Sequence, residues 1–181
     1  IRTMHHFWDL QIGVGKSWLI TEDITRVSLP FTFIEKNANC VHNGVLIFDI
    51  QLNEISKGYF QIGGETCLYF KYDFIGEINI EAENNDYNEK SVNEYKSWKK
   101  NQFPIKSITS LGDSSKSFGA EKEVKPMFMS VYGYFDGENH YRGGCSTRWG
   151  RYPHCSQMLL PSYSLAKSVY ASLALDELEK N

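Results

Sequence analysis

The sequence lacks an apolar run long enough to cross a bilayer and lacks a charge pattern suited to nucleic acid. Its longest apolar stretches, such as residues 45–48 and 158–160, are far shorter than the roughly 20 residues that a membrane helix needs. Lysine and arginine are scattered, and the formal net charge is only −3 at pH 7. Nucleic-acid sites gather basic residues on one face. We therefore expect no membrane span and no nucleic-acid partner.

Motifs for a metal or a cofactor are also missing. Cys145 and Cys155 are too far apart for a zinc knuckle, and no histidine has a second histidine three to five residues away. Residues 13–17 imitate the end of a phosphate-binding loop, but Leu10 stands where that motif needs glycine. We expect neither a bound metal nor a cofactor.

Four cysteines bear on the cellular compartment. They are Cys40, Cys67, Cys145 and Cys155. Two disulfides would suit a periplasmic or secreted protein, and three pairings are open. Buried free thiols in a reducing compartment are the alternative. The chain begins at Ile1 and ends in a helix-like pattern without a stop signal, so we interpret it as a fragment.

Residues 1–105 have the pattern of a β-rich accessory domain. Short runs of β-branched and aromatic residues alternate with polar or glycine-rich breaks, which is typical of antiparallel strands. The strands are expected at residues 27–34, 45–50, 59–62, 67–72 and 78–81, with turns at Asn43-Gly44 and Gly63-Gly64. We expect a sandwich-like unit that ends in a surface helix over residues 84–100.

Residues 106–181 are expected to form a second, incomplete domain, which makes the fold class α+β. A polar loop over residues 107–125 precedes a strand at 127–135, and Asp136-Gly137 is a strong hairpin turn into a returning strand at 140–142. Apolar residues then recur over 165–178 at a spacing that predicts a helix with one buried face. This helix is expected to begin at residues 162–164.

Ser164 and Lys167 are the residues best suited to catalysis. Side chains three positions apart lie on the same side of a helix, so the Lys167 amine can reach the Ser164 hydroxyl. A serine is a poor nucleophile until a neighbouring base takes its proton. The amino end of a helix adds N–H groups and a positive dipole where an oxyanion would develop. This arrangement predicts acyl transfer through Ser164.

The same spacing also occurs by chance. Ser97 and Lys100 match it, but Ser97 falls late in a charged helix, far from an amino end. The non-catalytic alternative is that Ser162 or Ser164 caps the helix and that Lys167 is a solvated lysine of the first turn. The preceding hairpin and the apolar helix behind Ser164 favour the catalytic interpretation.

Residues 161–175, PSYSLAKSVYASLAL, resemble the first active-site motif of the serine β-lactamase and penicillin-binding-protein family. The resemblance covers about the last 55 residues and implies the start of a β-lactamase-like domain, with Ser164 as nucleophile and Lys167 as its base. The family's other two motifs have no counterpart here, and the insertion between Cys145 and Cys155 is not a general family feature. We therefore expect this chain to be inactive alone.

A second hypothesis is a non-enzymatic module that binds a glycan or a protein. Aromatic residues in the β-rich region could stack on sugars, although such residues more often form a core; they are Tyr59, Phe60, Tyr69, Phe70, Tyr72 and Phe74. Arg142, Arg148 and Arg151 could bind a substrate carboxylate, although surface arginines are the commoner case. Under the first hypothesis the partner is a small-molecule or peptide substrate with an ester or amide bond.

Overall fold

The computed structural model describes residues 3–37, 40–52, 54–64, 73–81, 89–114, 131–147 and 149–180. The chain divides into two compact units. The first contains residues 1–80 and 154–181, and the second contains residues 81–153. The mixture of a large antiparallel sheet and helices confirms the α+β class. The sequence predicts a different division, with an accessory domain over residues 1–105 and the start of a catalytic domain over residues 106–181. That division stays a prediction.

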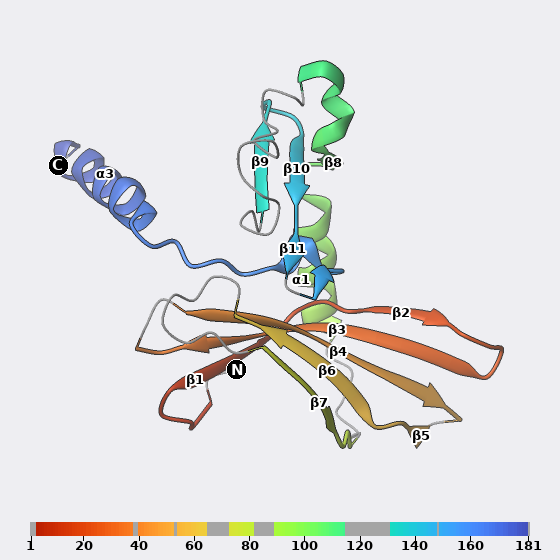
Figure 1. Cartoon of the computed structure of the whole chain (residues 1–181). Helices are drawn as coiled ribbons and strands as arrows, with labels where there is room; N and C mark the ends of the chain where they lie inside the picture. The colour runs from red at the N-terminus through yellow and green to blue at the C-terminus, as the bar shows by residue number, and fades with distance from the viewer. Residues whose placement is uncertain are drawn as a thin grey trace. The chain divides into compact units, whose positions relative to one another are not determined.

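The first unit is built on one antiparallel sheet of seven strands (Figure 1). The strands are β1 (Trp8–Ile12), β2 (Lys16–Leu19), β3 (Ile24–Glu35), β4 (Val41–Gln51), β5 (Glu54–Ile55), β6 (Gly58–Gly63) and β7 (Phe74–Ile78). The main order is β1-β3-β4-β6-β7, with β2 also paired to β3 and β5 to β4. A sandwich needs a second facing sheet, whereas the described residues of this unit form a single sheet.

The two longest strands follow directly from the sequence pattern. Both β3 and β4 are rich in β-branched and aromatic residues, and they pair along eleven registered positions from Ile24↔Gln51 to Ile34↔Val41. The turn expected at Asn43-Gly44 is wrong, because both residues lie inside β4. The strand expected at 67–72 lies outside the described residues, whereas the one expected at 78–81 ends earlier, at Ile78 in β7.

The edge of the sheet next to β3 is interrupted at a proline. β1 and β2 pair with successive halves of β3, and the break between them lies opposite Pro30. The Gly13 amide donates to the Pro30 carbonyl at 2.9 Å. Proline has no N–H to donate on that side of the strand. A continuous edge strand would therefore lose one of its bonds there.

The two faces of the sheet differ in chemistry. Side chains alternate along a strand, so Leu29, Phe31 and Phe33 share one face of β3, and Ser28 and Thr32 share the other. We call these the apolar face and the polar face. The segment of residues 154–159 is hydrogen-bonded to the polar face.

The described residues of the second unit form a helix, a 3-10 helix and two small sheets. Its elements are α1 (Glu89–Lys100), β8 (Ile105–Ser107), the 3-10 helix η1 (Ile108–Ser114), β9 (Val131–Phe135), β10 (His140–Gly144), β11 (Ser146–Thr147) and β12 (Gly150–Arg151). The predicted surface helix is confirmed as α1. The hairpin of β9 and β10 is confirmed too.

The hairpin turn follows the sequence prediction in detail. Gly137 has a φ of 102°, which glycine adopts without strain. The Asp136 carboxylate accepts hydrogen bonds from the amides of Glu138 and Asn139 at 2.9 and 2.7 Å. These backbone bonds lower the pKa of Asp136 to about 2. Gly137 therefore provides the backbone conformation that the turn needs, and Asp136 provides the acceptor for its amides.

Candidate active site

Ser164 stands at the N-cap of the helix α3 (Leu165–Glu179), as the sequence predicts. The residue before it, Tyr163, has a φ of 43°. This left-handed conformation is rare for a bulky residue, and such outliers are concentrated at functional sites. The chain therefore turns sharply just before it presents Ser164.

The first turn of α3 brings Ser164 and Lys167 to the same end of the helix. The Lys167 amide donates to the Ser164 carbonyl at 3.0 Å, and the Ala166 amide donates to the Tyr163 carbonyl at 3.2 Å. The Ser164 side chain makes no capping hydrogen bond. Both Ser164 and Lys167 are exposed. The structure thus gives the hydroxyl no capping role.

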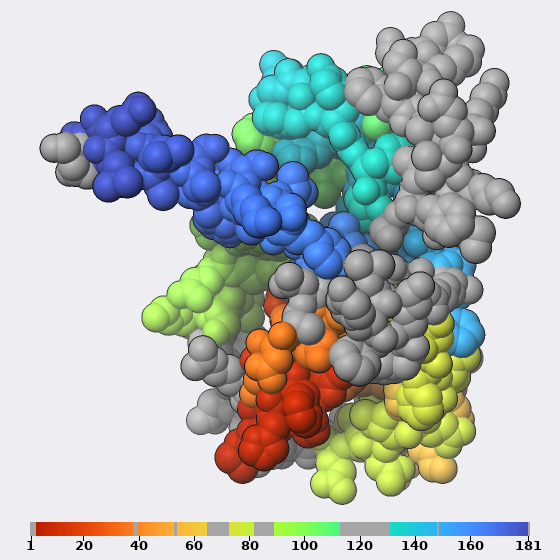
Figure 2. Space-filling view, turned by 60° about the vertical axis from the view of Figure 1, so that its left-hand side comes forward, coloured from red at the N-terminus to blue at the C-terminus, as the bar shows by residue number. Residues whose placement is uncertain are grey.

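The apolar residues of α3 depart from the sequence prediction. None of the helix residues is buried, and Leu165, Val169 and Leu173 are each more than half exposed. In Figure 2 the dark blue atoms of α3 are open to view. The predicted buried face is wrong for this structure, because spacing predicts a face but supplies no partner to cover it. Tyr170 and Leu175, which lie off that face, are equally exposed.

The described cysteines are oxidised, which agrees with the expectation of disulfides. Cys145 and Cys155 form a disulfide, Cys40 is also disulfide-bonded, and no described cysteine is free. Cys67 lies outside the described residues. Disulfides of this kind are typical of oxidising compartments.

Sequence analysis missed a buried serine and histidine pair in the first unit. Ser28 Oγ lies 2.8 Å from His154 Nε2, and both residues are buried. Burial lowers the pKa of His154, and the positive charge of Lys16 lowers it further. Strand alternation placed Ser28 in β3, but no local signal in the sequence connects it with His154.

A second contact missed by the sequence anchors the same segment. Asn43 Nδ2 donates to the Leu159 carbonyl at 2.8 Å, and the Leu159 amide donates to Asn43 Oδ1 at 2.9 Å. Thr32 Oγ1 also donates to Asn43 Oδ1, at 3.0 Å. The Gln157 side chain bonds both the amide and the carbonyl of Val14. The 154–159 segment is therefore attached to the first unit at three places, two on the polar face and one at Val14, between β1 and β2.

The remaining candidate residues do not form a further reactive cluster. Ser97 lies in the last turn of α1 and is exposed. This is the position, far from the amino end of a helix, that the sequence predicts for it. Burial lowers the pKa of Arg142, and so does the nearby charge of Arg151; Arg148 lies outside the described residues. Among the residues that the structure describes, no group of three or more potential ligands could hold a metal. No described helix combines the length and apolarity needed to span a membrane.

The described residues of the aromatic run are divided between the two faces of the sheet. Tyr59 and Phe74 are each more than half exposed, and they lie on opposite faces. Phe60 lines a cavity on the apolar face, and its ring centroid is 5.6 Å from that of Phe74. Tyr69, Phe70 and Tyr72 lie outside the described residues.

Comparison with protein families, with curated proteins and with solved structures found no match to this chain. Its function is therefore inferred from its own residues and their arrangement.

Proposed function

We propose that this chain carries the nucleophile segment of a serine hydrolase that acts on an ester or amide through an acyl-enzyme. The observation that carries the proposal is Ser164, held at the amino end of α3 directly after a left-handed residue, with Lys167 in the first turn. The absence of a capping hydrogen bond from Ser164 removes the main structural explanation for a serine at this position.

The proposed reaction has two stages, the acylation of Ser164 and the hydrolysis of the acyl-serine. Ser164 Oγ bonds to the carbonyl carbon while its proton passes to Lys167 Nζ. The amide N–H groups at the start of α3 favour the negative oxygen of the tetrahedral intermediate. The leaving group takes the proton from Lys167 as its bond to carbon breaks, which leaves an acyl-serine. Water then cleaves that ester, releases the acid and restores the Ser164 hydroxyl.

The proposed reaction also needs a further oxyanion donor and a general acid, which the second and third motifs of the serine β-lactamase family supply. Helices with exposed apolar side chains such as those of α3 normally pack against other parts of a domain. The disulfides support a periplasmic or secreted location.

Labelling with a fluorophosphonate tests the proposal. The full-length protein is treated with the probe, and the modified peptide is identified by mass spectrometry. We expect an adduct on Ser164 that disappears in Ser164→Ala, whereas Ser97→Ala is the matched control and keeps it. Both serines are exposed, so neither change should alter the fold, which circular dichroism checks. An adduct at another residue, or none, would overturn the proposal.

A further inference from the structure

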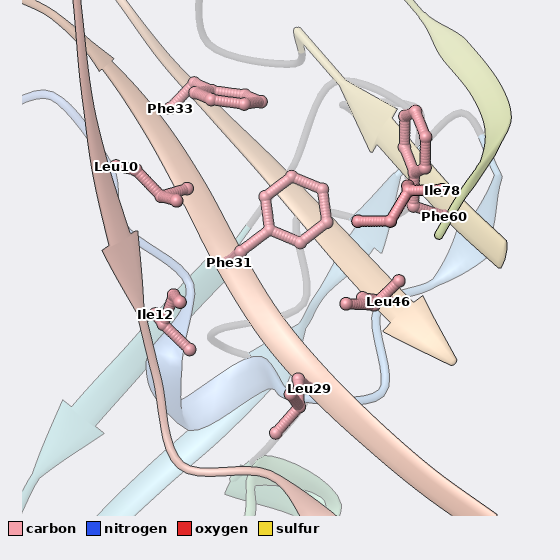
Figure 3. A pocket seen from close by; sticks show the side chains of 8 residues that line it. All are labelled: Leu10, Ile12, Leu29, Phe31, Phe33, Leu46, Phe60 and Ile78. Atoms are coloured by element: carbon pink, nitrogen blue, oxygen red, sulfur yellow. The ribbon is translucent and has the colours of Figure 1, made fainter. Parts of the chain in front are cut away.

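The apolar face of the seven-stranded sheet contains an open cavity of about 270 Å³ (Figure 3). Every residue that lines it is leucine, isoleucine or phenylalanine; they are Leu10, Ile12, Leu29, Phe31, Phe33, Leu46, Phe60 and Ile78. None of the eight is fully buried. A concave lining made mostly of apolar side chains is common in ligand-binding sites.

Glycines shape the floor of the cavity. Phe31 and Gly44 are registered partners on β3 and β4, and the Phe31 ring occupies the space that a Cβ on Gly44 would need. Phe60 is related to Gly76 in the same way, with its Cζ 2.8 Å from the position of such a Cβ. Because the rings lie over glycines, they flatten against the sheet and leave open space above them.

The rings also support one another. The centroids of Phe31 and Phe33 are 5.7 Å apart and those of Phe31 and Phe60 are 6.3 Å apart, both in edge-to-face contact. Such contacts hold aromatic side chains in place. Figure 3 shows Phe31 at the centre of the cluster, with the aliphatic side chains around it. The cavity is thus preformed by the sheet.

The lining decides which ligand chemistry fits. A sugar or an extended peptide has hydroxyl or amide groups in every unit, and burying such a group without a hydrogen bond is costly. The lining side chains offer no donor and no acceptor. A ligand must therefore bury a part that is wholly hydrocarbon and leave its polar part in water.

We propose that this cavity binds the alkyl chain of a medium-chain lipid, whose head group stays in solvent. Small-molecule sites usually have volumes of about 300–1,000 Å³, so this cavity is just below that range and suits one unbranched chain. At about 30 Å³ for a group the size of water, the volume holds about nine methylene groups. This proposal is independent of Ser164.

The affinity should depend on chain length and hardly on the head group. Each added methylene buried in the cavity should tighten binding by about fourfold, from hexanoate to decanoate. Beyond about ten carbons the cavity is full, so the gain should stop. Decanol should bind within about threefold of decanoate, because the lining does not contact the head group.

The test is isothermal titration of the full 181-residue chain with hexanoate, octanoate, decanoate and decanol below their aggregation concentrations. Ile12→Trp fills the cavity from β1, at a position already half exposed, and should weaken decanoate at least about tenfold. Leu19→Trp is the matched control on β2, at a position that is also exposed but lies outside the cavity. It should leave binding unchanged. Thermal melts establish that both variants fold.

Three results would overturn the proposal. The first is that no alkyl compound binds at any chain length. The second is binding that Ile12→Trp and Leu19→Trp affect equally, which would indicate nonspecific partition onto the sheet. The third is a concentration-dependent dimer in ultracentrifugation that Ile12→Trp abolishes and decanoate leaves intact, since the cavity would then contact a second copy. None of these results bears on labelling at Ser164.

Discussion

Ser28 and His154 lie 126 positions apart in the sequence, yet Oγ of the first and Nε2 of the second are 2.8 Å apart in a buried hydrogen bond. Through this bond, the segment that leads to Ser164 is attached to the polar face of the sheet. The two residues share a compact unit. The stability of that attachment can be measured through the histidine, because its protonation changes with pH.

We expect the free energy of unfolding to decrease in acid partly because of His154. Burial lowers the pKa of His154 below its ordinary value of 6.5, so the unfolded chain takes up the proton at a higher pH than the folded one. The contribution of His154 is therefore complete above the unfolded pKa and is lost as pH falls through the folded pKa. Urea unfolding at about pH 7.5 and about pH 5 measures the decrease.

His154→Gln is the matched variant for this prediction. Glutamine keeps a partner for Ser28 but cannot take up a proton in this range. Its stability should fall less between the two pH values than that of the natural chain. Burial also lowers the pKa of His42, while Asp73 opposes the shift, and this contribution is common to both proteins. An equal acid loss in the two would refute the role given to His154.

Asn43→Ala should loosen the 154–159 segment. The substitution removes a side chain that bonds both the amide and the carbonyl of Leu159 and leaves those groups without these partners. The expected loss is about 1–3 kcal/mol of unfolding free energy. Amide hydrogen exchange should accelerate at Leu159. Asn93→Ala, on the exposed surface of α1, is the control and should stay within about 0.5 kcal/mol; faster exchange in both variants would contradict this prediction.

Sequence patterns predicted the strands well where one alternation dominates. β3 and β4 were expected because apolar and β-branched residues recur along them, and the Asp136-Gly137 turn was expected because its local conformation has few other solutions. The turn predicted at Asn43-Gly44 was wrong, because this dipeptide is compatible with more than one local structure. The same dipeptide that often makes a turn here lies within a strand, where Gly44 makes room for the Phe31 ring and Asn43 bonds Leu159.

Only those features of the candidate site that depend on neighbouring residues in the sequence could be predicted. The start of α3 at Ser164 could be read from neighbouring residues, because helix capping is a local property. The exposure of Leu165 and Val169 could not, since burial depends on which other elements pack against a helix. The pair of Ser28 and His154 was equally inaccessible, because its members are brought together by the fold of the whole unit.

Gly44→Ala should destabilise the sheet by about 1–3 kcal/mol through overpacking. Its new methyl group would meet the ring of Phe31, which must then move. Combining it with Phe31→Leu should cost less than the sum of the two single changes, by at least about 0.5 kcal/mol. Phe103→Leu, in the second unit, should be additive with Gly44→Ala. Denaturant unfolding of the single and double variants provides these values, and additivity in both pairs would argue against the close approach.

Lys167→Arg should separate catalysis from structure at the amino end of α3. Arginine keeps the positive charge and is a good helix former, so a solvated first-turn lysine would tolerate the change. A lysine that takes the Ser164 proton would not, because arginine cannot be deprotonated in proteins. Thermal stability should therefore be unchanged, while fluorophosphonate labelling of Ser164 in the full-length protein falls by at least about 100-fold.

Lys100→Arg is the control for that experiment, since Lys100 has the same spacing from Ser97 and is equally exposed. Labelling should be unaffected by it. Normal labelling in Lys167→Arg would mean that another group activates Ser164.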